Sequence, residues 1–167
     1  MNRVGAMPSA GVAALILAPA TAAALTLAGA AFSLDVDQTP ADVAVVEGVF
    51  DAFFGPASQA IDLDVTTGAI NVGEAVAFDF VFAAPVANGV GADLILIDGR
   101  FGAGAVEISI DGGGAYFPVA ASDFVDSGVS EALDGFGGPF AFTPFVASID
   151  LSDFGVLAGT SFTTLRL

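Results

Sequence analysis

The sequence lacks cysteine, histidine, lysine and tryptophan, and only three basic residues occur among its 167 positions. Without cysteine the chain cannot carry a disulfide framework. Without histidine, Ser-His-Asp catalysis, Cys-His catalysis and histidine-bound zinc are all excluded. Without lysine, Schiff-base chemistry and phosphate binding by a P-loop lysine are excluded as well. Paired carboxylates are therefore the main catalytic option that remains.

The charge of the chain is strongly acidic, with 19 Asp and Glu residues and a net charge of −16. Such a chain repels phosphates, so nucleic acid and anionic membrane surfaces are not expected as partners. The charge suits solubility in a salty medium, and a specific cation-binding role is the alternative. The hydrophobic fraction of 55%, with 16 Phe, is ample for the core of one domain of ordinary size.

The first thirty residues have the pattern of an export signal. Arg3 supplies a positive start, an apolar run follows from Gly11 to Leu27, and Ala28-Gly29-Ala30 fits a small-residue cleavage site. We therefore expect a signal helix at 1–30, a single domain at 31–167, and a secreted or cell-surface location. Membrane contact is expected only through this segment, and a retained membrane anchor is the alternative.

The stretch from Gly91 to Gly114 organises the rest of the chain. Four large apolar residues stand between Asp93 and Asp98, which is typical of a short strand buried on both faces. The next segment alternates, with Val106, Ile108 and Ile110 expected on the core side and Glu107, Ser109 and Asp111 in water.

A hairpin is expected directly after this alternating segment. Asp111-Gly112 is a strong hairpin turn signal, and Tyr116, Phe117 and Val119 would form the return strand. Because Pro118 cannot donate a hydrogen bond, that strand should lie at an edge of its sheet or end there.

Further short strands are expected on both sides of this stretch. Residues 39–54 fit either a helix that begins near Thr39 or a strand over Val43–Val46, and we favour the strand because valine dominates. The other expected strands are Ala60–Val65, Ala75–Phe82 (with Val76, Phe78, Phe80 and Phe82 on one face), Val146–Leu151 and Ser161–Leu167. A loop is expected over Pro85–Gly91, and the irregular, aromatic-bearing region Asp126–Pro144 is expected to fold over the core or to form a binding rim. Strands at such short spacing predict an all-β sandwich or barrel.

Several motifs occur in a particular order along the chain. They are Phe54-Gly55-Pro56, Phe78–Phe82 followed by Pro85–Gly91, Asp93–Asp98, Val106–Gly112 and Ile149–Val156. Together they resemble secreted bacterial cell-surface domains that often carry a C-terminal PEP-CTERM or VPLPA-CTERM sorting tail. The resemblance covers the chain from about Val43 onward and implies a jelly-roll-like antiparallel β-sandwich outside the cytoplasm. Such domains usually continue into an acidic stretch and a sorting tail, so the domain at 31–167 is expected to be truncated or to have lost its anchor.

Carboxylate pairs are the first candidates for chemistry. Asp93 and Asp98 are five residues apart on one strand, so they face opposite sides and are expected to end the strand or to bind loop amides. Two other pairs, Asp35 with Asp37 and Asp62 with Asp64, lie within the separation that glycosidases use. Exposed alternation along a strand also explains Asp62 and Asp64, and we prefer that interpretation.

No cofactor is expected from the sequence, and bound calcium is the alternative. Calcium binds six to eight oxygens from loops, and Asp111, Asp123, Asp126 and Asp134 lie in or near glycine-bearing loops. No EF-hand pattern is present, so these four are weak candidates.

Three functions follow from these patterns. The leading one is a non-catalytic extracellular or cell-surface β-sandwich with an adhesive, matrix or recognition role, binding extracellular polysaccharide or other surface proteins. The alternative is a carbohydrate-binding module of jelly-roll type, although Tyr116 is the single tyrosine and sugar platforms usually use Trp or Tyr. A carboxylate-only hydrolase comes third.

Overall fold

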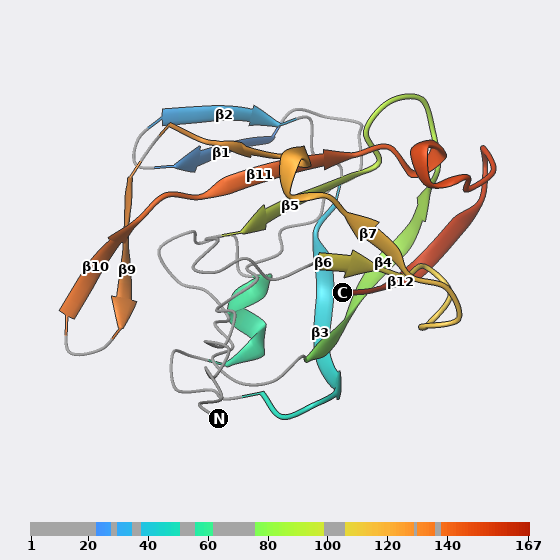
Figure 1. The fold of residues 1–167 in the computed structure, drawn as a ribbon, viewed down its shortest axis with the longest axis horizontal. Coiled ribbons are helices and arrows are strands. Elements are labelled where there is room, and N and C mark those ends of the chain that lie inside the picture. Colours follow the sequence, from blue (N-terminus) through green and yellow to red (C-terminus); the bar gives the residue numbers. More distant parts are fainter. Residues whose placement is uncertain are drawn as a thin grey trace, which may run out of the picture.

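The computed structural model describes residues 23–27, 30–34, 38–50, 56–61, 76–98, 106–128, 130–135 and 138–167. Within these ranges the regular structure is almost entirely antiparallel β, joined by short 3-10 helices (Figure 1). The prediction of an all-β fold is therefore confirmed. The strands are β1 (Ala23–Leu27), β2 (Ala30–Leu34), β3 (Pro40–Glu47), β4 (Ala77–Ala87), β5 (Leu94–Asp98), β6 (Val106–Ile108), β7 (Phe117–Val119), β8 (Phe124–Asp126), β9 (Glu131–Gly135), β10 (Gly138–Phe142), β11 (Phe145–Ile149) and β12 (Ser161–Arg166).

The sheet β12-β4-β3 has β4 at its centre. Phe78, Phe80 and Phe82 alternate along β4 and are all buried, as the sequence predicts. The strand over Val43–Val46 is also confirmed, as part of β3. The expected loop at Pro85 is wrong, because β4 continues to Ala87. The register of β4 against β12 shifts between Phe162 and Thr164. This irregularity accommodates Pro85, which cannot donate a backbone hydrogen bond.

The sheet β5-β11-β8 has β11 at its centre. Every residue of β5 is buried, so the continuous apolar run does mark a strand covered on both faces. The predicted strand over Val146–Leu151 is confirmed as β11, which begins at Phe145 and is followed by the 3-10 helix η4 (Leu151–Phe154).

The hairpin β6-β7 is confirmed, with Pro118 opposite Glu107 on the short strand β7. Val106 and Ile108 are buried and Glu107 is exposed, as expected. The prediction that Ser109 faces water is wrong, because this residue is fully buried. Ser109 forms a β-bridge with Arg166, which joins the hairpin to β12.

Three other expectations need correction. The region Asp126–Pro144 contains the antiparallel hairpin β9-β10, where a loop was expected. Ala60 ends a 3-10 helix, η2 (Ala57–Ala60), where a strand was expected to begin, and 62–65 lie outside the described residues. Ala23–Leu27 form β1, paired with β2, where a signal helix was expected, and 1–22 lie outside the described residues. Within the described ranges, none of the helices has the length and apolarity needed to cross a membrane.

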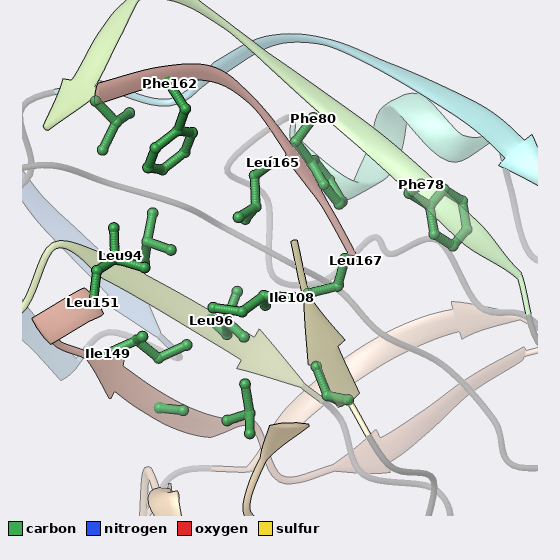
Figure 2. Close-up of a cluster of buried hydrophobic side chains, with 14 of the residues drawn as sticks. Phe78, Phe80, Leu94, Leu96, Ile108, Ile149, Leu151, Phe162, Leu165 and Leu167 are labelled. Carbon is green, nitrogen blue, oxygen red and sulfur yellow. The ribbon is translucent and has the colours of Figure 1, made fainter. Parts of the chain in front are cut away.

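The core lies between the β4-β12 pair and the β5-β11 pair. Figure 2 shows Phe80, Phe162 and Leu165 directed toward Leu94 and Leu96, and Ile108 of β6 lies beside Leu96 in the same core cluster. Many of these side chains are fully buried, so the core fixes the strands and hence the loops at both ends of the sheets.

Candidate functional site

An ion pair stands where β12 meets β4. Arg166 and Asp79 are direct cross-strand partners, so their side chains project from the same face of the sheet. The Arg166 Nε donates to Asp79 Oδ1 at 2.7 Å and Nη2 donates to Asp79 Oδ2 at 3.0 Å. This is the two-point geometry in which a guanidinium binds a carboxylate most strongly. Both side chains are mostly buried.

Two further groups surround the same guanidinium. Its Nη1 lies 3.4 Å from Glu47 Oε1, at the exposed end of β3, and its remaining partner is the Tyr116 side chain. The hydrogen bond to Asp79, and next the one to Tyr116, raise the pKa of Arg166 above its ordinary value. Arg166, on β12, is therefore a fixed cation that contacts β4 through Asp79, β3 through Glu47 and the segment before β7 through Tyr116.

The loop between β6 and β7 is held by the carboxylate of Asp111. Its Oδ1 accepts hydrogen bonds from the Ser109 hydroxyl at 2.8 Å and from the backbone N–H groups of Gly114 and Ala115 at 2.8 and 3.0 Å. The Ser109 Oγ in turn accepts from the Gly113 N–H at 2.9 Å. Because these donors favour the charged carboxylate, the amide of Ala115 most of all, the pKa of Asp111 is lowered.

This loop packs directly on the ion pair. A Cβ added at Gly113 would lie 2.8 Å from Arg166 Nη1 and 3.0 Å from the Tyr116 hydroxyl. Gly113 also has a φ of +96°, which favours glycine. The hairpin loop, Tyr116 and Arg166 thus form one unit, which we call the Arg166 cluster (Glu47, Asp79, Ser109, Asp111, Gly113, Tyr116 and Arg166).

A second polar cluster joins the loop after β4 to the segment after β11. Asp93 is 2% exposed, and its two carboxylate oxygens accept from the Gly89 N–H at 2.7 Å and the Leu151 N–H at 2.9 Å. The expectation that Asp93 binds loop amides is therefore confirmed. Asn88 lies beside it and contacts the same segment through Ser152 and Val156.

The four weak calcium candidates lie in different segments: Asp111 is in the loop between β6 and β7, Asp123 ends the 3-10 helix η3 (Ala121–Asp123), and Asp126 and Asp134 lie on the strands β8 and β9. Asp111 binds its own loop, Asp123 Oδ2 accepts from the Ala120 N–H at 3.0 Å, and Asp126 Oδ1 accepts from the Gly128 N–H at 2.7 Å. Asp134 lies on β9, opposite Pro139. In the part of the chain that the structure describes, no three acidic side chains come close enough together to hold a metal ion. A specific calcium site at these positions stays the alternative to screening of the acidic charge by any salt.

Of the other carboxylates considered from the sequence, the structure describes only Asp98. Asp98 is buried at the end of β5, in agreement with a strand-ending role. Asp35, Asp37, Asp62 and Asp64 lie outside the described residues.

Sequence reasoning identified Asp93 and Asp111 but missed other residues of the two clusters. Arg166, Asp79 and Asn88 were not singled out, although a usable signal existed for Arg166. A lone cation on the last expected strand of a chain with 19 acidic residues is expected to find a carboxylate partner.

The arrangement is suited to presenting a fixed surface. Tyr116 is 40% exposed while its hydroxyl side is held by Arg166, so its ring stands at the surface in one orientation. The hairpin loop beside it is held by four hydrogen bonds of the Asp111 carboxylate and the Ser109 hydroxyl. No protein-family model, no curated protein and no solved structure matches this chain.

Proposed function

We propose that this chain is a non-catalytic, exported β-sandwich of jelly-roll type with an adhesive, matrix or recognition role at the cell surface. The observation that carries the proposal is the use of the carboxylates. Those of Asp79, Asp93 and Asp111 bind the protein's own guanidinium and loop amides. Carboxylates that bind groups of the protein itself fix the shape of the loops. Fixed loops on a rigid β scaffold are a usual platform for recognition.

The sandwich architecture is supported by the position of the core. The β4-β12 pair and the β5-β11 pair face each other across buried side chains, as two sheets of a sandwich do. The export proposal is supported by the sequence of residues 1–30 alone. An acidic protein outside the cell would meet polysaccharide or other surface proteins, and not nucleic acid.

The proposed export is tested by determining the N-terminal residue of the mature protein. The protein is produced in a bacterial host with its first thirty residues intact, and the exported fraction is analysed by mass spectrometry. We expect a chain that begins near Ala31. An uncleaved Met1 in the cytoplasmic fraction would contradict export.

Carbohydrate binding is the second candidate, and the exposed ring of Tyr116 favours it. A glycan array with the wild-type protein and the Tyr116→Ala variant separates the two functions. Binding that is lost in the variant would assign a sugar platform. Binding to surface proteins without any glycan signal supports the recognition role, and turnover of a polysaccharide would show the carboxylate-only hydrolase instead.

A further inference from the structure

Asn88-Gly89 is the one Asn-Gly sequence in the chain. In such a sequence the backbone nitrogen of the glycine can attack the carboxamide carbon of the asparagine. The new C–N bond closes a succinimide ring, and the side-chain nitrogen leaves as ammonia. Water then opens the ring to aspartate or isoaspartate. Glycine permits this reaction best because no Cβ obstructs the approach and its backbone is the least restricted.

The fold holds every polar atom of Asn88, which is 3% exposed. Its backbone N–H donates to Thr160 O at 2.8 Å, and its carbonyl accepts from the Gly159 N–H at 2.9 Å. The side-chain Nδ2 donates to Val156 O at 2.8 Å, and Oδ1 accepts from the Ser152 hydroxyl at 3.1 Å. The carboxamide is therefore bound to a segment more than sixty residues away along the chain.

The attacking nitrogen is held as well. The Gly89 N–H donates to Asp93 Oδ1 at 2.7 Å, and Asp93 is itself buried and bound to Leu151. For the ring to close, the Gly89 nitrogen must lose its proton and the Asn88 carboxamide must turn toward it. Each movement breaks buried hydrogen bonds, which are costly to leave unmade.

We propose that Asn88 is a site of spontaneous deamidation that folding closes. While the chain is unfolded the reaction proceeds at Asn88-Gly89, and in the folded protein these hydrogen bonds make it many times slower. The product also cannot form the same hydrogen bonds, since an aspartate at position 88 cannot donate to Val156 O. An isoaspartate adds a carbon to the backbone and displaces the bonds to Gly159 and Thr160.

The first test compares folded and unfolded protein. The full chain is incubated at mildly alkaline pH with and without guanidinium chloride, then cleaved after glutamate and analysed by mass spectrometry. Cleavage at the glutamates places Asn88 in the peptide 75–107 and Asn71 in the peptide 48–74. We expect the mass increase of an amide-to-acid conversion in peptide 75–107 to appear many times faster in the unfolded sample than in the folded one. Equal conversion in both samples would overturn the proposal.

Asn71 serves as the internal reference for sequence chemistry. It precedes Val72, whose branched side chain hinders the attack, so peptide 48–74 should convert more slowly than peptide 75–107 in denaturant. Equal rates for the two peptides would show that Asn88-Gly89 is not a preferred site, and would also overturn the proposal.

The second test loosens the carboxamide in the folded protein. Ser152→Ala removes the hydroxyl that donates to Asn88 Oδ1, and Ser148→Ala at an exposed position of β11 is the control. Loss of one hydrogen bond should raise the population of the locally opened state, in which the Asn88 carboxamide is free to turn. The native deamidation rate should rise with it, about fivefold. The control should keep the wild-type rate. A Ser152→Ala rate equal to that of the control would show that this contact does not close the site.

Discussion

Arg166 on β12 and Asp79 on β4 are paired twice, once through the backbone register of their strands and once through two charge-assisted hydrogen bonds of 2.7 and 3.0 Å. The backbone of Arg166 also exchanges hydrogen bonds with Ser109, its N–H donating to Ser109 O and its carbonyl accepting from the Ser109 N–H. Arg166 thus joins the β12-β4-β3 sheet to the β6-β7 hairpin.

The first prediction concerns this ion pair. Arg166→Met keeps the length of the side chain but leaves the mostly buried Asp79 carboxylate without its cation, so the denaturation midpoint in urea should fall clearly. Glu47→Gln is the matched control, because Glu47 contacts the same guanidinium from an exposed position and should change the midpoint little. Equal shifts in the two variants would show that Asp79 is not the dominant partner.

The second prediction separates backbone strain from contact in the hairpin loop. Gly112 and Gly113 both have positive φ, +76° and +96°, so alanine at either should cost about 1 kcal/mol through strain. A Cβ at Gly112 meets nothing within 4 Å, whereas at Gly113 it meets Arg166 and Tyr116. Thermal unfolding should therefore show a greater loss for Gly113→Ala. Equal losses would mean that the loop does not pack on the guanidinium.

The third prediction concerns the buried serine of the β6-β7 hairpin. Ser109→Asp would place a second carboxylate against Asp111 in a fully buried position, and should lower the unfolding free energy by at least about 3 kcal/mol or prevent folding. The neighbouring Glu107→Gln, on an exposed position, should stay within about 0.5 kcal/mol of wild type. Chemical denaturation of both variants measures the difference, and a tolerated Ser109→Asp would place Ser109 in water after all.

The burial of Ile108 gives a third point for the same series. Ile108→Ala removes a fully buried side chain between the two strand pairs and should cost about 2–5 kcal/mol. A cost as small as that of Glu107→Gln would show that the register of β6 is reversed.

The fourth prediction is a pH dependence. Folding lowers the pKa of Asp111, so the charged carboxylate adds stability above its unfolded pKa of about 4. That stability is lost as the pH falls through the lower folded value, because the carboxylate is then protonated in both states. Asp111→Asn lacks this titration. The gap between the urea midpoints of wild type and variant should be largest near neutral pH and should shrink below about pH 4. A gap that stays constant would exclude the carboxylate as the group that holds the loop.

The fifth prediction concerns calcium. The net charge of −16 implies self-repulsion that any salt relieves. We expect calcium and sodium at equal ionic strength to raise the melting temperature equally, which is the result of screening. A further rise that saturates with calcium, and disappears in Asp111→Asn, would instead show a specific site.

Much of the β architecture followed from periodicity alone. Alternating phenylalanines predicted the buried face of β4, and the unbroken apolar run predicted a doubly covered β5, because both patterns reflect burial directly. The hairpin β9-β10 was missed because Gly135, Gly138 and Pro139 are residues typical of loops, and their cross-strand pairing is not visible in composition.

The Arg166 cluster was beyond the reach of sequence reasoning for a different reason. In the sequence, Ser109 continues the alternating pattern of β6. In the structure, β6 ends before Ser109, which forms a β-bridge with Arg166, 57 positions away. Long-range contacts of this kind reverse the exposure of a residue without any local signal. Asp111 was correctly noticed as a loop carboxylate, but its partners proved to be the amides of its own loop.

The position of β12 sets the order in which the molecule can form. β12 lies between β4, about eighty residues earlier in the chain, and the β6-β7 hairpin, so neither neighbour has its complete set of partners until this late segment arrives. Closing loops of that length slows folding, since the entropy is lost before the contacts form. We therefore expect the chain to fold slowly. Until β12 has been synthesised, one edge of β4 is unpaired and the phenylalanines of β4 lack their contacts with β12. A chaperone would recognise such exposed apolar residues.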